Sequence, residues 1–99
     1  MEFKEMLELA RKEKVAIEKM PLQFQMEMCE KITKDEFQQY IRVQKQGWSG
    51  LGIESMFTEK AQQVSGLSKG KYIMCIKYYN ALSQTHGIGK DLRTGYWRA

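Results

Sequence analysis

The single histidine and the glycine run beside it are the residues of this 99-residue chain that come nearest to a catalytic pattern. Histidine is the commonest general base near neutral pH, but no HExxH, CxxC or GxSxG motif accompanies His86. The run Gly87-Ile88-Gly89-Lys90 has the glycine and lysine of a phosphate loop, yet Gln84 and Asp91 occupy positions where that loop needs glycine and serine or threonine. We therefore expect His86 to cap helix carbonyls. We also expect no enzyme activity, no cofactor and no small-molecule substrate.

The two cysteines, Cys29 and Cys75, are far apart in the sequence and have no metal-ligand spacing around them. In a reducing compartment such residues are usually free and partly buried, and a disulfide or a shared metal is the alternative. The charged segment Met1 to Glu5 lacks the apolar stretch of a secretory signal. The longest apolar run, residues 72–76, is too short for a bilayer that needs about 20 residues. We expect a cytoplasmic protein without a membrane partner.

Positive charge is concentrated in the last third of the chain. Residues 66–99 contain six lysines and arginines and one acid, whereas residues 1–65 contain ten basic and eleven acidic residues. Basic side chains that contact phosphates release counterions and supply most non-specific affinity for nucleic acid. Tyr78, Tyr79, Tyr96 and Trp97 lie among these cations, as base stacking requires, although core packing is the alternative for the tyrosines. The predicted nucleic-acid or nucleoprotein contacts are Lys69, Lys71, Lys77, Tyr78, Lys90, Arg93, Trp97 and Arg98.

Apolar residues at helical spacing predict an all-α protein, a compact bundle of four or five short helices in a single domain over residues 1–99. Pro21 follows the first helix, since proline cannot continue a helix interior. Residues 22–32 fit both a strand and a helix period, but their Met, Gln, Glu and Leu content favours a helix. Thr33 and Glu36 form a capping box before the next helix. The inward positions of the first helix are Phe3, Met6, Leu7, Ala10, Ile17 and Met20.

Two more helices complete the predicted bundle. One covers about 53–64, with Val64 among its inward residues. The other covers about 69–85 behind a Ser68 cap and places its lysines in the basic C-terminal third, 66–99. The tail, 90–99, is expected to form a turn of helix and an extension.

Residues 58–79 resemble a helix-turn-helix unit. Ala61 would lie at the tight contact between the two helices, and Gly66-Leu67-Ser68 would form the turn. The second helix of such a unit enters the major groove with its first residues, so the resemblance implies that Lys69 and Lys71 contact DNA. An ordinary helical hairpin is the alternative.

The later part of that unit departs from the usual pattern. Tyr72 and Cys75 occupy expected apolar positions, but Ile73 and Ile76 are one residue out of phase, and Gly70 weakens the start of the helix. Residues 82–92 also resemble the glycine-hydrophobic-glycine turn of helix-hairpin-helix modules, which implies that turn amides bind a phosphate. Its second helix would be short.

A protein partner is the competing hypothesis. Trp48 and Leu51 lie in the glycine-rich loop 47–52, and an exposed tryptophan is a favoured anchor of protein interfaces. A Trp48 ring folded back over the core is the alternative. Small chains without enzyme motifs are also typical of phage and mobile-element accessory proteins, including anti-CRISPR inhibitors, an analogy at the level of class alone. The alternative function is therefore inhibition of a host protein machine by protein–protein binding, with Trp48 and Leu51 as the contacts.

Overall fold

The computed structural model covers the whole chain, and the structure describes residues 2–28, 32–45, 57–91 and 94–98. Within these ranges the order is six helices followed by two short strands. The predicted all-α bundle is confirmed, with one more helix than expected and a small strand pair that was not predicted. The elements are α1 (Phe3–Glu18), α2 (Leu22–Met28), α3 (Lys34–Lys45), α4 (Glu59–Ser65), α5 (Lys69–Lys77), α6 (Tyr79–His86), β1 (Gly89–Lys90) and β2 (Trp97–Arg98).

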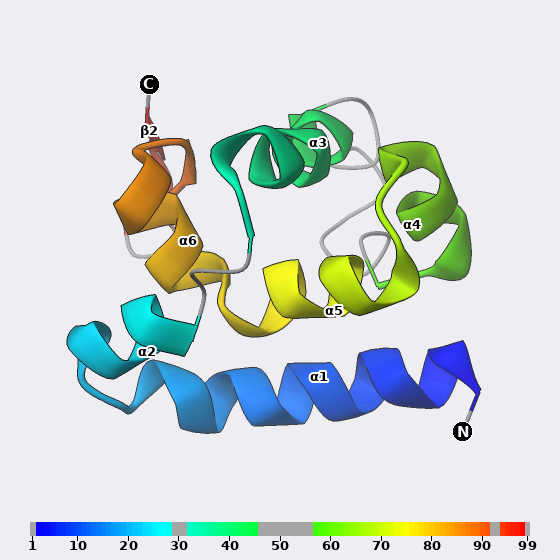
Figure 1. Cartoon of the computed structure of the whole chain (residues 1–99), viewed down its shortest axis with the longest axis horizontal. Coiled ribbons are helices and arrows are strands. Elements are labelled where there is room, and N and C mark those ends of the chain that lie inside the picture. The colour runs from blue at the N-terminus through cyan, green and yellow to red at the C-terminus, as the bar shows by residue number, and fades with distance from the viewer. Residues whose placement is uncertain (1, 29–31, 46–56, 92–93, 99) are drawn as a thin grey trace.

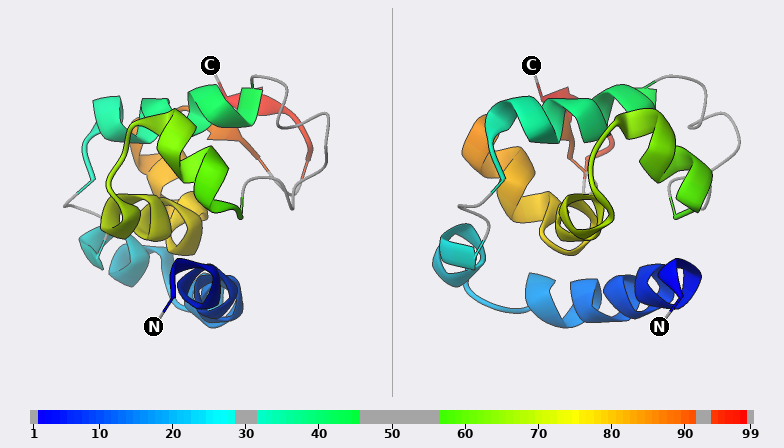
Figure 2. Two further views of the ribbon diagram at one scale, coloured as in Figure 1. Left: turned by 90° about the vertical axis from the view of Figure 1, so that its right-hand side faces the viewer. Right: turned by 45° about the vertical axis from the view of Figure 1, so that its right-hand side comes forward.

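The helix α5 lies in the middle of the molecule. Figure 1 shows α1 along one side and α3 along the other, with α5 between them. Figure 2 gives the same order when α5 is seen end-on. The core is therefore built around α5 and α6, and its least exposed large side chains include Phe37, Tyr72, Ile76 and Leu82. No helix in the described ranges has both the length and the apolar character needed to cross a bilayer.

The first two helices follow the sequence pattern closely. Phe3, Leu7, Ala10 and Ile17 of α1 are buried, as their helical spacing predicted. Met20 was predicted to lie inward but is exposed, because α1 ends at Glu18 and the chain then leaves the helical direction. The ambiguous segment after Pro21 is helical over the residues of α2, which confirms the helix preference there.

The capping box before α3 is confirmed atom by atom. The Thr33 N–H donates to Glu36 Oε1 at 3.0 Å, and the Glu36 N–H donates to Thr33 Oγ1 at 3.2 Å. Two amides that the first turn of a helix would leave unpaired are thereby satisfied. The buried stripe of α3 is Phe37, Tyr40, Ile41 and Val43.

The predicted helix over 69–85 is wrong in one respect, since it is two helices. The backbone leaves helical geometry at Tyr78, where φ is −110° and ψ is 26°. Tyr78 and Ala81 are buried together with Tyr72, Ile76 and Tyr79. These positions lie on more than one side of a straight helix with 3.6 residues per turn. The break changes the direction of the chain, so that α6 packs against α2 and buries residues that would face solvent on a straight continuation of α5.

The inward face of α4 also differs from the prediction. Val64 is half exposed, whereas Gln62 and Ser65 are buried with Ala61. Both polar side chains bond the turn that follows α4. Gln62 Nε2 donates to the Leu67 carbonyl at 2.7 Å, and the Leu67 N–H donates to Ser65 Oγ at 3.1 Å. Burial of the Gln62 amide nitrogen and the Ser65 hydroxyl is tolerated because each bonds the backbone. Gln62 Oε1 is buried without a hydrogen-bond partner among the described residues.

The tail was expected to form a turn of helix and an extension, but it returns as an antiparallel strand. Gly89 pairs with Arg98, and Lys90 pairs with Trp97. Two residues per strand are too few for a period-2 pattern to be visible in the sequence. Several predictions fall outside the described residues: Cys29, the loop 47–52 with Trp48 and Leu51, residues 53–56 of the fourth predicted helix, and Arg93.

Candidate nucleic-acid interface

The turn between α4 and α5 has the local form that the helix-turn-helix resemblance implies. The Ala61 N–H donates to Thr58 Oγ1 at 3.1 Å at the start of α4, and Ala61 itself is fully buried. Gly66 ends α4 with a φ of 78°, a left-handed conformation that favours glycine. Ser68 Oγ then accepts the Lys71 N–H at 3.2 Å and caps α5.

The surroundings of α5 do not suit a recognition helix. Lys69 lies 3.6 Å from Glu59 of α4, and its ammonium also lies over the Phe3 ring of α1. Lys71 forms an ion pair with Glu36 of α3. Exposed pairs of this kind are worth only about 0–1 kcal/mol, so they alone do not remove these lysines from binding. The stronger argument is the packing of α5, since α1 lies along one side of this helix and α3 along the other.

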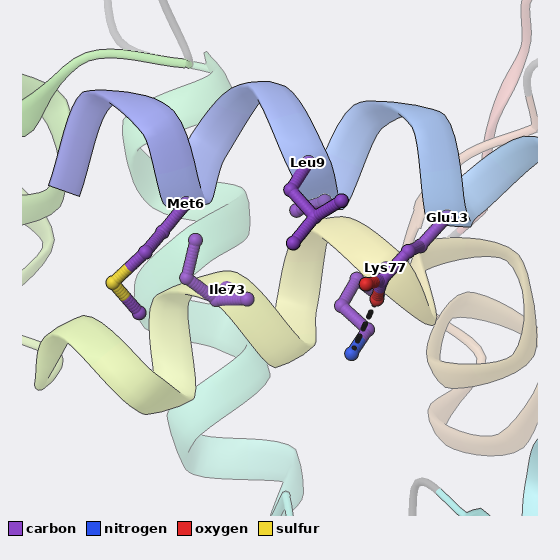
Figure 3. A pocket seen from close by; sticks show the side chains of 6 residues that line it. Met6, Leu9, Glu13, Ile73 and Lys77 are labelled. Carbon is purple, nitrogen blue, oxygen red and sulfur yellow. Dashed lines mark ion pairs between the residues drawn. The ribbon is translucent and has the colours of Figure 1, made fainter. Parts of the chain in front are cut away.

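Lys77, at the end of α5, is held in the same way. Its ammonium lies 2.9 Å from the carboxylate of Glu13 on α1. A groove of about 200 Å³ beside this pair is lined by Met6, Leu9 and Ile73. Figure 3 shows Glu13 and Lys77 at one end of it. The predicted cations of α5 therefore connect α5 to α4, α3 and α1.

The carboxylate partner of Lys71 is itself fixed by the capping box of α3. The hydrogen bonds that Glu36 accepts from Lys71 and from the Thr33 N–H lower the pKa of this carboxyl. It is thus ionised at neutral pH and stays available to the Lys71 ammonium. One acidic side chain serves both the start of α3 and the contact between α3 and α5.

The tyrosines of the basic third belong to the core. Tyr78 is 8% exposed and Tyr79 is 2% exposed, so neither ring offers a face for a base. Tyr79 instead joins three elements through its hydroxyl, which donates to Gln44 Oε1 at 2.9 Å and accepts the Lys90 N–H at 2.7 Å. Burial raises the pKa of this phenol. The predicted stacking role of Tyr78 is not supported.

The strand β1 and the residue before it are bonded to α6, and Gly89 lies close to Ile41 of α3. Ser83 Oγ donates to the Ile88 carbonyl at 2.7 Å. Gly89 has a φ of +98°, and a Cβ built there would lie 3.0 Å from Ile41 Cδ1 and 3.2 Å from both Ser83 Oγ and the Tyr79 hydroxyl. The helix-hairpin-helix resemblance fails at this point. The Lys90 amide bonds Tyr79, and a strand replaces the second helix.

The outer face of the strand pair gathers cations and aromatic rings. The register sets Lys90 opposite Trp97, so their side chains lie on the same face. The Lys45 ammonium lies over the Trp97 ring, 5.1 Å from its centroid. Trp97 is 41% exposed and Tyr96 is 78% exposed. We call this region the strand-pair surface and define it by Lys45, Lys90 and Trp97, with the exposed Tyr96 next to them in the chain. Arg98 follows Trp97 in β2 and lies on the opposite face of the pair, because successive strand residues alternate.

Charge on this surface is less neutralised than on α5. On the opposite face of the strand pair, Arg98 is paired, and its Nη2 lies 3.3 Å from Asp91 Oδ2. Among the described residues, no carboxylate lies within ion-pair distance of Lys45 or Lys90. Arg42 is exposed one helical turn before Lys45 and extends the basic character along α3. Lys45 and Arg42 were not among the predicted contacts, since nothing in the local sequence indicates that the end of α3 meets Trp97.

The residues with possible reactivity are placed as structural groups. His86 Nε2 lies 3.1 Å from the Ile32 carbonyl, and its ring packs 6.1 Å from that of Phe37. Cys75 is a free, buried cysteine, and burial raises the pKa of its thiol to about 12. Across the ranges that the structure describes, no three His, Cys, Asp or Glu side chains are grouped as metal ligands.

Comparisons with protein families, with curated proteins and with solved structures gave no match.

Proposed function

We propose that this chain is a non-enzymatic binding protein that contacts nucleic acid, alone or within a nucleoprotein, through the strand-pair surface. The observation that carries the proposal is the exposed Trp97 ring, which lies beside Lys90 in the strand register and beneath the Lys45 ammonium. Flat rings interleaved with cations are the features that nucleic acids require, because bases stack and phosphates pair with ammonium groups.

The charge pattern favours this surface over α5. Lys69, Lys71 and Lys77 have carboxylate partners, which an approaching phosphate would have to displace. For Lys45 and Lys90, a phosphate would replace only water and, at Lys45, a weak ring contact. Within the basic C-terminal third, the proposed contacts therefore move from α5 to the strand pair.

Fluorescence anisotropy of labelled nucleic acids at about 50 and 200 mM salt tests the proposal. The test variant is Lys45→Glu with Lys90→Glu. Its matched control is Lys12→Glu with Lys19→Glu, which makes the same change in net charge at two exposed positions, one within α1 and one just beyond its end, on the other side of the molecule. We expect the first pair to reduce affinity at about 50 mM salt by roughly tenfold or more. The slope of the logarithm of affinity against the logarithm of salt concentration should also become smaller, by an amount equivalent to about two phosphate contacts.

Two results would contradict the proposal. Equal losses in both double variants would mean that only net charge matters and that the strand-pair surface is not the site. No binding of duplex or single-stranded probes at the lower salt would exclude direct nucleic-acid contact and leave the protein-partner alternative as the one to test by affinity capture.

A further inference from the structure

The Trp97 ring is held at the surface by a contact that a ligand can replace. A lysine ammonium above an exposed indole is a weak cation–π contact, and Lys45 is an exposed side chain with a flexible stem. A nucleobase stacked on an aromatic ring binds more strongly than such an exposed cation. A base that displaced Lys45 would also free its ammonium for the adjoining phosphate. Lys90, on the same face, provides a second phosphate contact.

The shape of this region argues against a duplex. In a duplex the bases stack on one another, and a side chain reaches a base face only after costly unstacking. Each strand of the pair has two residues, and β1 is bonded to α6 through the Lys90 N–H and the Tyr79 hydroxyl. Among the residues that the structure describes, this surface consists of the strand pair and the end of α3 and includes no first turn of a helix. The helix that the sequence offered for a major groove, α5, lies between α1 and α3. A single strand presents its bases without unstacking.

We propose that the ligand of the strand-pair surface is a single-stranded nucleic acid, one base of which stacks on Trp97 in place of the Lys45 ammonium. This inference rests on the proposed function and specifies the class of nucleic acid. Stacking does not require a 2′-hydroxyl, so single strands of DNA and RNA are both expected to bind.

Two measurements on the same probes test the inference. The probes are an unstructured single-stranded DNA oligonucleotide, its RNA counterpart, and the DNA annealed to its complement. Anisotropy reports binding to the unchanged chain. The chain has two tryptophans, so quenching of tryptophan emission in a Trp48→Phe variant reports on Trp97 alone. We expect both single strands to bind and to quench Trp97, and the duplex to bind at least about tenfold more weakly.

Variants separate stacking from general surface effects. Trp97→Leu is expected to weaken single-strand binding by roughly 5- to 150-fold, and Trp97→Phe to retain part of the affinity. Phe24→Leu is the matched control, because Phe24 is an exposed aromatic residue on α2; it is expected to leave the affinity unchanged. Circular dichroism checks that each variant is folded.

The outcomes distinguish this inference from the proposed function. If no probe binds at low salt, both fail. If the duplex binds as tightly as the single strands, the inference fails and the proposed function stands. The inference also fails, and the proposed function stands, if single strands bind without quenching Trp97 and the Trp97→Leu variant keeps the affinity of the unchanged chain.

Discussion

Gly89 is the position where one added methyl group should disturb the strand-pair surface most. Its φ of +98° is a conformation that side-chain-bearing residues avoid, and forcing alanine into it costs about 1–3 kcal/mol. The added Cβ would also lie 3.0 Å from Ile41 Cδ1 and 3.2 Å from Ser83 Oγ and the Tyr79 hydroxyl. Ile41 Cδ1 ends a flexible side chain and can move, so the contacts add only about 1 kcal/mol.

The sum predicts that Gly89→Ala destabilises the fold by about 2–4 kcal/mol. A chain of this length has a total stability of about 5–15 kcal/mol, so the variant should still fold. Its midpoint of thermal unfolding should fall by about 10–30 °C, since 1 kcal/mol corresponds to about 4–8 °C in a small domain. The measurement is thermal and urea unfolding followed by circular dichroism.

Two other glycines provide matched controls. Gly95→Ala has the same kind of positive φ, +79°, but a Cβ there meets nothing within 4 Å. The difference between Gly89→Ala and Gly95→Ala therefore measures the contacts of β1 with α3 and α6. Gly70→Ala lies in the first turn of α5 in open space and should stabilise the protein by up to about 1 kcal/mol. A Gly89→Ala variant within about 1 kcal/mol of the unchanged chain would refute the described anchoring of β1.

Three further predictions follow from the same structure. Tyr79→Phe should cost about 1–3 kcal/mol in urea unfolding, since it leaves the Lys90 N–H and Gln44 Oε1 without their shared partner; an unchanged midpoint would show that this hydroxyl does not hold the strand pair. Thr33→Ala should cost about 1 kcal/mol by loss of the cap on α3, and a stability equal to that of the unchanged chain would contradict this contribution. The useful pH interval runs from 9.0, the ordinary pKa of a thiol, to 10.0, the ordinary pKa of a tyrosine. In this interval the Cys75 thiol ionises in the unfolded chain, whereas the buried thiol, with a pKa raised to about 12, stays protonated. The unchanged chain should therefore lose about 1 kcal/mol relative to Cys75→Ala across that interval, and a stability gap independent of pH would refute the burial of this thiol.

Local signals in the sequence determined where several elements begin and end. Thr33 and Glu36 formed the predicted capping box, because its bonds join residues three apart and need no distant partner. Gly66 and Ser68 likewise formed the predicted turn before α5. The helical spacing of α1 also indicated most of its buried face correctly.

Only the tertiary structure decided what those elements face. Tyr78 and Trp97 are both aromatic residues among cations in the sequence, yet the first is buried where α6 turns away from α5 and the second is exposed on β2. Lys71 pairs with Glu36 and Lys45 lies over Trp97, and each pair joins distant parts of the chain. Such contacts depend on how the helices pack and not on local residue preference. The physical reason is that burial and charge pairing belong to the assembled fold, whereas caps and turns belong to a few neighbouring residues.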